Sequence, residues 1–219
     1  PRLERLREGE RAALERADAV VTLTRALAED LRAELGGPEK IAVIPDGAAP
    51  ELFHVAPEDR RPEPGRFVYA GSLAPWKGLE MTLQALSDVP EASLDVCGGD
   101  LASPDGRAAV DLARALGIAG RVHFHGSLPQ PALRPFFASA CAGILPLDGR
   151  YSIAARYTSP LKLFEYLCAG LPVVASDLPS IREIVAQEKE GLLFEDRNAG
   201  ALANALRRLA SEPGLARRL

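Results

Sequence analysis

Hydrophobic and polar positions along this chain alternate between short apolar runs and longer stretches with helical spacing. Within residues 1–50, this pattern predicts a charged amphipathic helix, a strand over 19–24, a helix over 25–37 and a second strand over 40–47. Residues 51–65 are rich in proline and charge and have no sustained period, which is typical of a linker. We therefore expect the end of one domain before this linker and a second domain after it.

Residues 66–219 repeat the alternation of apolar strands and amphipathic helices. The predicted strands span 66–71, 93–99, 121–126, 142–147, 171–176 and 191–194. The predicted helices span about 78–88, 106–117, 130–139, 160–169, 179–188 and 197–211. Strands separated by helices imply right-handed parallel crossovers, so the pattern predicts a Rossmann-like, doubly wound α/β sheet beside a partial second α/β domain. In such sheets, ligands bind beyond the carboxyl ends of the strands.

Composition and charge argue against several classes of protein. The formal net charge of −4 disfavours a general nucleic-acid binder, which needs a wide basic face. The three cysteines lie far apart in apolar runs, as reduced core thiols of a cytoplasmic protein do, and the three histidines lack the spacing of a metal site. Every apolar run is shorter than the roughly 18 to 20 residues of a membrane span, and the charged start does not resemble a signal peptide.

The stretch VYAGSLAPWKG, residues 68–78, has the pattern of an anion-binding turn. A buried strand ends at Ala70, Gly71 lets the chain turn closely, and a helix begins near Gly78, so that backbone amides converge. Lys77 lies at this point in a chain with 22 arginines and only four lysines, and a compact ammonium suits phosphate oxygens. The alternative is a solvated lysine at a helix start. The stretch matches neither a Walker loop nor a GxGxxG fingerprint.

The stretch TSPLKLFEYLCAGLPVVASD, residues 158–177, predicts a second helix N-terminus that follows a strand. Ser159 and Pro160 have the residue types of an N-cap and a first helical position. Lys162 and Glu165 are three residues apart and form either a surface ion pair or part of a ligand site. The neighbours of Glu165 are apolar, and a carboxylate can accept hydrogen bonds from two ribose hydroxyls, so the residues alone leave both interpretations about evenly balanced.

Five segments, in this order, resemble the family 4 glycosyltransferases of the GT-B fold. They are IAVIPDGAAPELF, VYAGSLAPWKGLEMTLQAL, RVHFHGSLPQPALRPFFASACAGILPL, SPLKLFEYLCAGLPVVASDLPSIREIV and GLLFEDRNAGALANAL. The resemblance implies two Rossmann-like domains across a cleft, with residues 1–50 ending an acceptor domain and 66–219 forming the nucleotide-sugar donor domain. It also implies transfer of a sugar from a nucleoside diphosphate to an acceptor hydroxyl with retention, promoted by preorganised electrostatics without a metal.

The same resemblance assigns expected roles to individual residues. Lys77 corresponds to the lysine that holds the donor diphosphate and Glu165 to the acid that holds the ribose hydroxyls, and these two are the catalytic candidates. Gly126 and Ser127 lie in the loop where the family places the base. The expected donor-binding residues are Gly71, Ser72, Lys77, Gly126, Ser127, Ser159, Pro160, Leu161, Lys162 and Glu165.

The chain departs from the family pattern at two positions. The family often has an arginine where this chain has Ser72, which removes one cation from the diphosphate site, and Lys162 could replace part of that charge. The family also often has an acid at the position of Tyr157, so the identity and orientation of the sugar become an open question. Glu183, where the family often has an acid, is expected on a helix surface, and Arg156 is expected in a solvated loop.

The implied partners are a UDP-, GDP- or ADP-sugar as donor, a glycan, lipid or small molecule as acceptor, and no cofactor. Most of the acceptor domain lies outside the sequence, so we expect this piece to be inactive by itself, with any peripheral membrane contact made by the missing part. One alternative is a nucleotide-sugar epimerase of GT-B-like fold. Another is a non-catalytic sugar-nucleotide-binding or scaffolding module, which Ser72 and Tyr157 would fit.

Overall fold

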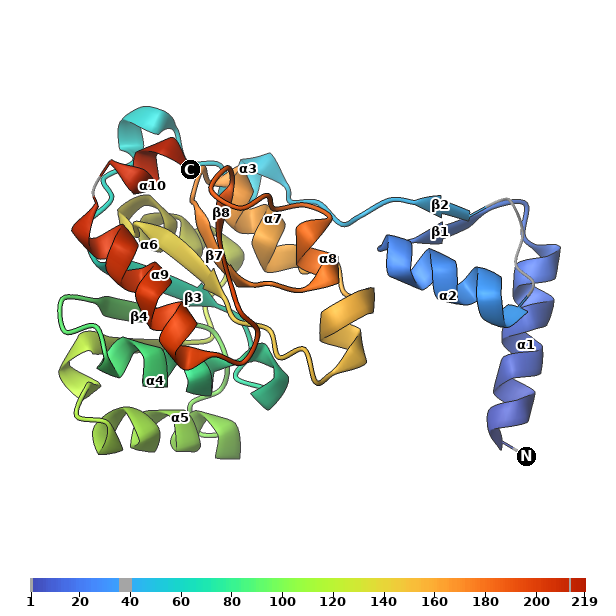
Figure 1. Ribbon diagram of the computed structural model, residues 1–219, viewed down its shortest axis with the longest axis horizontal. Coiled ribbons are helices and arrows are strands. Elements are labelled where there is room, and N and C mark those ends of the chain that lie inside the picture. The colour runs from blue at the N-terminus through green and yellow to red at the C-terminus, as the bar shows by residue number, and fades with distance from the viewer. Residues whose placement is uncertain (1, 36–40, 213) are drawn as a thin grey trace.

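Two parallel β-sheets of different size organise the chain (Figure 1). The computed structural model describes residues 2–35, 41–212 and 214–219. The smaller sheet pairs β1 (Val20–Thr22) with β2 (Ile41–Val43), and helices α1 (Arg2–Arg16) and α2 (Arg25–Leu35) accompany it. This smaller unit lies to one side of the larger sheet, and the chain runs from β2 into the larger unit through an extended segment.

The larger sheet has six parallel strands in the spatial order β5-β4-β3-β6-β7-β8. These strands are β3 (Arg66–Ala70), β4 (Ser93–Cys97), β5 (Val122–Gly126), β6 (Ala142–Leu145), β7 (Val173–Ser176) and β8 (Gly191–Phe194). Strands β4 and β5 follow one another on one side of β3, and strands β6, β7 and β8 follow one another on its other side. This arrangement confirms the predicted doubly wound α/β fold, and its order reverses between β3 and β6, where such sheets bind ligands.

Helices cover both faces of the larger sheet. One face carries α4 (Leu79–Ser87), α5 (Pro104–Ala115), α9 (Ala199–Ser211) and α10 (Leu215–Arg218). The other face carries α3 (Pro50–Phe53), α6 (Arg134–Ser139), α7 (Leu161–Cys168) and α8 (Pro179–Arg182). Neighbouring strand residues face opposite ways, so Phe67 packs with the first set and Val68 with the second, and both are fully buried. Burial on both faces explains why the strands are almost continuously apolar.

Short helical turns complete the connections. They are η1 (Pro57–Asp59), η2 (Pro75–Lys77), η3 (Ala119–Arg121), η4 (Gln130–Leu133) and the π-helical turn η5 (Ile153–Tyr157). The helix predicted over 130–139 is therefore a 3₁₀ turn followed by α6, with a proline inside each part. Residues 153–157 were expected in a loop, and the final helix α10 was not predicted.

The helix predicted over 179–188 is wrong in length, because α8 ends at Arg182. Glu188 adopts a left-handed φ of 61°, which a continuing helix cannot accommodate. The carboxylate of Glu190 also accepts a hydrogen bond from the Ala186 N–H, so this backbone has partners outside a helix. The predicted end of the helix over 25–37 and the start of the strand over 40–47 lie outside the described residues. Among the helices that the structure describes, each is too short or too polar to cross a membrane.

Candidate functional site

A cavity of about 340 Å³ opens beyond the carboxyl ends of β3 and β6, where the strand order reverses. Leu23 and Asp46 from the smaller unit form part of its wall, so both sheets contribute. The structure brings seven of the ten predicted donor-binding residues to this wall, namely Gly71, Ser72, Lys77, Ser159, Pro160, Leu161 and Lys162. Two loops far apart in sequence, after β3 and before α7, therefore meet at one site.

Lys77 is held at the cavity by the tight turn η2 and by Gly78. Gly78 has a left-handed φ of 75°, and a Cβ at this position would lie 1.8 Å from the carbonyl oxygen of Pro146 in the loop after β6. Only glycine allows the two loops to approach this closely. The Lys77 Nζ lies 3.9 Å from the centroid of the Trp76 ring, so the two neighbouring side chains make a cation–π contact.

The electrostatics around Lys77 favour an anion. Burial lowers the pKa of its ammonium, and the positive charge of Lys162 lowers this pKa further. Within the described part of the chain, no carboxylate lies at ion-pair distance from Lys77. A buried cation without a counter-ion is unfavourable, so a negatively charged ligand in the cavity would stabilise the charged form of Lys77.

Helix α7 brings Lys162 to the same cavity and holds Glu165 behind it. The Lys162 Nζ lies 2.7 Å from Glu165 Oε2, and the two side chains are 27% and 5% exposed. The ion pair considered in the sequence analysis therefore forms, but its carboxylate is buried instead of lying on the surface. Glu165 lies next to the cavity rather than on its wall. Tyr166 anchors α7 to the sheet, because its Oη accepts a hydrogen bond of 2.8 Å from the Ala70 N–H.

Ser159 does not cap α7, which corrects the sequence-based prediction. The helix begins at Leu161, and Pro160 occupies the N-cap position in an extended conformation without a side-chain cap. The Ser159 hydroxyl is instead used by the smaller unit, because it accepts a hydrogen bond of 2.9 Å from the Asp46 N–H. The Leu163 N–H donates to the Pro160 carbonyl at 2.9 Å, so the N–H groups of Leu161 and Lys162 are the ones that the first turn of α7 can offer to an anionic ligand.

The ends of β3, β4 and β5 form a glycine shelf beside the cavity, consisting of Gly71, Gly98, Gly99 and Gly126. The Gly71 N–H donates to the Cys97 carbonyl at 3.0 Å, and the Gly98 N–H donates to the Gly126 carbonyl at 2.7 Å. A Cβ on Gly98 would lie 2.3 Å from the Gly71 carbonyl oxygen, so the backbones touch. The positive φ of Gly98, Gly99 and Gly126 favours glycine at these positions. The sequence analysis did not single out Gly98 and Gly99, although two adjacent glycines at the end of a strand could have indicated them.

Gly126 and Ser127, the two residues predicted to lie near the base, are placed differently from the other predicted donor-binding residues. Gly126 belongs to the glycine shelf, whereas Ser127 is exposed, and neither lines the cavity itself. Gly126 is hydrogen-bonded to Gly98, and Gly98 lies against Gly71, which lines the cavity. Whether the shelf receives a base stays a prediction.

Tyr157, at the position where an acid was expected, contacts the smaller unit. Its Oη donates to Asp30 Oδ2 at 2.6 Å, and Arg156 Nη2 lies 2.8 Å from Asp30 Oδ1. The Thr24 hydroxyl donates to the Arg156 carbonyl at 2.7 Å. The prediction that Arg156 lies in a solvated loop is therefore wrong, because Arg156 contacts the smaller unit. The hydrogen bond from Tyr157 is the largest cause that lowers the pKa of the Asp30 carboxyl group, with Arg156 adding to it.

Glu183 makes a second contact between the two units. Both of its carboxylate oxygens accept from the Arg25 N–H, at 3.0 and 3.1 Å, at the first residue of α2. A carboxylate at a helix N-terminus also interacts favourably with the helix dipole. Sequence reasoning placed Glu183 on a helix surface, and it missed this partner because the contact spans 158 positions.

We expect the variant Tyr157→Phe to loosen α2 from the larger unit. Removal of one hydrogen bond to Asp30 should raise the amide hydrogen-exchange rates of α2 by about three- to tenfold, because one of the contacts that hold α2 against the larger unit is lost. Tyr151→Phe is the matched control, because Tyr151 is exposed. Unchanged exchange in α2 would contradict the role assigned to Tyr157.

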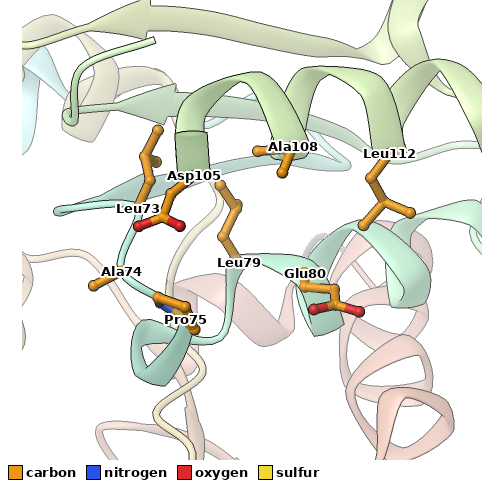
Figure 2. A pocket seen from close by; sticks show the side chains of 9 residues that line it. Leu73, Ala74, Pro75, Leu79, Glu80, Asp105, Ala108 and Leu112 are labelled. Atoms are coloured by element: carbon orange, nitrogen blue, oxygen red, sulfur yellow. The ribbon is translucent and has the colours of Figure 1, made fainter. Parts of the chain in front are cut away.

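A second cavity, of about 300 Å³, lies between α4 and α5 (Figure 2). Leu73, Leu79 and Leu112 contribute apolar wall, and the carboxylates of Glu80 and Asp105 lie at its edge. Two acids disfavour a phosphate ligand there. The cavity beyond β3 and β6 is therefore the better candidate for an anion.

Comparison with known families covers nearly the whole chain. Residues 64–212 match the family model described as "Glycosyl transferases group 1", and residues 1–47 match a "Glycosyl transferase 4-like domain". A D-inositol 3-phosphate glycosyltransferase of Rhodococcus jostii is 27% identical over 94% of this chain and 48% of its own length. A 2-deoxystreptamine glucosyltransferase of Streptomyces kanamyceticus is 27% identical over 93% of this chain and 54% of its own length. The chain thus spans about half the length of these relatives.

Solved structures show the same fold. A sucrose-phosphate synthase from Thermosynechococcus elongatus superposes with a TM-score of 0.80 at 27% identity, covering 95% of this chain and 53% of that one. The Anabaena protein HepE, in complex with UDP and glucose, superposes with a TM-score of 0.76 at 20% identity, covering 97% of this chain and 59% of that one. The second likeness carries information on the fold alone.

Proposed function

Because this chain belongs to the group 1 glycosyl transferases, we propose that its cavity beyond β3 and β6 binds the diphosphate of a nucleoside diphosphate sugar, the donor in a glycosyl transfer. One observation carries the proposal. Lys77 and Lys162, from separate elements, line one cavity, and within the described residues Lys77 has no carboxylate at ion-pair distance. A diphosphate compensates the charge of Lys77 and fits a site bordered by glycine backbone and an uncapped helix.

The chemistry of this site follows from the charge that develops during transfer. As the bond between the sugar and the diphosphate breaks, negative charge grows on the departing phosphate oxygens. Lys77 and the N-terminus of α7 border the cavity in which that charge would develop, and Lys162 would join them on leaving Glu165, so these groups would stabilise the transition state electrostatically. We extend the proposal to transfer with retention and without a metal, as the family resemblance implies.

Glu165 enters this scheme through an exchange of partners. In the structure its carboxylate is occupied by Lys162. When a diphosphate attracts the Lys162 ammonium, the carboxylate becomes free to accept hydrogen bonds from the two ribose hydroxyls of the same donor. The nucleoside would then extend from the cavity across the glycine shelf, with its base near Gly126.

Binding of UDP, GDP, ADP and inorganic pyrophosphate to this chain, measured by calorimetry, tests the proposal. We expect saturable binding of at least one nucleotide, with pyrophosphate competing for the same site, and UDP is titrated first. A chain that binds none of the four would contradict the proposal and favour the alternative of a scaffolding module. The matched families give no support to the epimerase alternative.

The acceptor and the cellular location stay predictions. The names of the relatives include a D-inositol 3-phosphate glycosyltransferase and a 2-deoxystreptamine glucosyltransferase, so the acceptor differs among proteins of similar distance. We propose that the part of the acceptor domain outside this sequence determines it. That part would also make any peripheral contact with a membrane, and the proposed compartment is the cytoplasm.

Nucleotide binding should weaken as the pH rises. The weakening should begin at a pH below the ordinary lysine pKa of 10.5, because the pKa of Lys77 is lowered in the free protein. A bound diphosphate raises this pKa again, so binding takes up a proton between the two values and becomes weaker as pH rises through that window. Calorimetry in buffers of different ionisation enthalpy measures the uptake. The same measurement on Lys77→Ala should show no such onset, and an unchanged profile would contradict the assignment.

A further inference from the structure

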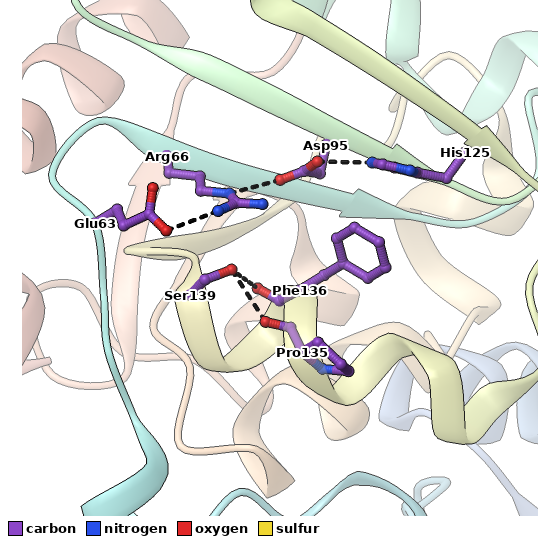
Figure 3. Close-up of polar contacts among 7 residues, drawn as sticks. All are labelled: Glu63, Arg66, Asp95, His125, Pro135, Phe136 and Ser139. Carbon is purple, nitrogen blue, oxygen red and sulfur yellow. Dashed lines mark hydrogen bonds and ion pairs between the residues drawn. The ribbon is translucent and has the colours of Figure 1, made fainter.

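A charge network around one buried carboxylate lies on the sheet face beside α6 and outside the proposed diphosphate site (Figure 3). The Asp95 side chain, in the middle of β4, is only 2% exposed. Its Oδ2 accepts a hydrogen bond of 2.8 Å from Arg66 Nε on β3, and its Oδ1 lies 2.7 Å from His125 Nε2 on β5. Glu63, before β3, binds Arg66 in turn at 2.7 Å. The network therefore joins three adjacent strands.

Stability alone gives a weak reason for such a network. Removing a carboxylate from water is costly, and apolar side chains of similar size often stabilise a core equally well or better. The neighbours of Asp95 along its own face of the sheet, such as Cys97 and Val68, are apolar and fully buried. An ionic group between them is better explained by a need to hold a particular residue in place.

The residue held in this way is His125, which occupies a bulge. Val96 pairs with Phe124 and Cys97 pairs with Gly126, so His125 is the extra residue in β5. His123, two residues earlier, pairs with Asp95, so regular alternation places His125 on the same face of the sheet as Asp95. Its imidazole contacts Asp95 there, and the ring also packs against Phe136 at 4.5 Å between centroids.

His125 is also the residue directly before the edge of the glycine shelf. Gly126 follows it with a left-handed φ of 66°, and its carbonyl accepts the hydrogen bond from the Gly98 N–H. A change in the position of His125 is therefore passed directly to Gly126 and from there to Gly98. Lys77 and Lys162 lie on other elements, the turn after β3 and helix α7.

We propose that His125, held by Asp95 and Arg66, is a positioning residue for the nucleoside half of the donor. It fixes the glycine shelf against which the base binds, and it leaves the diphosphate half of the site unaffected. This inference rests on the proposed function. It predicts a selective defect, in which the affinity that depends on the nucleoside is lost and the affinity for the diphosphate is kept.

Calorimetric titration of the full chain with UDP and with inorganic pyrophosphate tests the inference. In His125→Phe, which keeps a ring against Phe136 but loses the bond to Asp95, we expect the Kd for UDP to rise about tenfold. The Kd for pyrophosphate should stay within about twofold, because Lys77 and Lys162 are unchanged. His125→Gln, which retains a polar nitrogen at similar reach, should recover most of the UDP affinity. His123→Gln is the matched control, because His123 lies on the same strand and its side chain makes no hydrogen bond or ion pair within the described residues.

The outcomes distinguish a failure of the role assigned to His125 from a failure of the proposed function. Equal losses for UDP and pyrophosphate, or no loss for either, would overturn the positioning role of His125. If His125→Phe fails to fold, Asp95→Asn gives the same comparison, because it preserves the shape of the side chain. This variant must show the same selective loss of UDP affinity. A wild-type chain that binds neither UDP nor pyrophosphate would instead overturn the proposed function, and this inference with it.

Discussion

Replacement of Lys77 by alanine is expected to weaken UDP binding by about 30- to 100-fold. The reason is the local charge balance: Lys77 is half-buried beside Lys162, and a bound diphosphate would be its counter-ion. A charge-assisted hydrogen bond in such a site contributes about 2 to 3 kcal/mol, which corresponds to the expected loss in affinity. If the proposed transfer takes place at this site, the same variant should lose nearly all turnover, because the charge on the leaving diphosphate would no longer be stabilised.

Lys189→Ala is the matched control for this prediction. Lys189 is 77% exposed and lies near Glu190, so its removal changes the net charge by the same amount away from the cavity. A general electrostatic effect on an anionic ligand would weaken binding in both variants, whereas a specific contact weakens it only in Lys77→Ala. Near-wild-type affinity in Lys77→Ala would contradict the assignment of the cavity as the diphosphate site.

The sequence predicted the larger sheet well because its strands are buried on both faces. Such strands are continuous apolar runs, and the helices between them have strong apolar periodicity, so element type and order could be determined locally. The cavity was predictable for a related reason: parallel strands place their carboxyl ends at one edge, so Gly71 and Lys77 had to lie near the loop before α7. Fold and site location thus followed from short-range patterns and one topological rule.

Long-range contacts could not be predicted in this way. Ser159 has the residue type of an N-cap, but the Asp46 N–H, 113 positions away, uses its hydroxyl. Tyr157 and Arg156 have no sequence signal for Asp30, and Glu183 has none for the start of α2. Each of these polar groups has several local alternatives of similar energy, and the packing of the smaller unit on the larger one selects among them.

Replacement of Gly78 by alanine is expected to destabilise the fold and to displace Lys77 together. The new Cβ would lie 1.8 Å from the Pro146 carbonyl oxygen, so the loops after β3 and β6 must move apart. We expect the free energy of unfolding to fall by about 3 kcal/mol or more, from steric overlap added to the cost of a left-handed φ for alanine. UDP affinity should fall as well, because Lys77 precedes Gly78 directly.

Gly117→Ala isolates the steric part of this effect. Gly117 has a φ of 71°, close to the 75° of Gly78, but a Cβ there would meet no atom within 4 Å. Its alanine variant should therefore lose only about 1 to 2 kcal/mol in chemical denaturation and keep its UDP affinity. Equal destabilisation in the two variants would mean that the backbone conformation, and not the contact with Pro146, makes glycine necessary at residue 78. The position of Lys77 would then depend on the turn η2 alone.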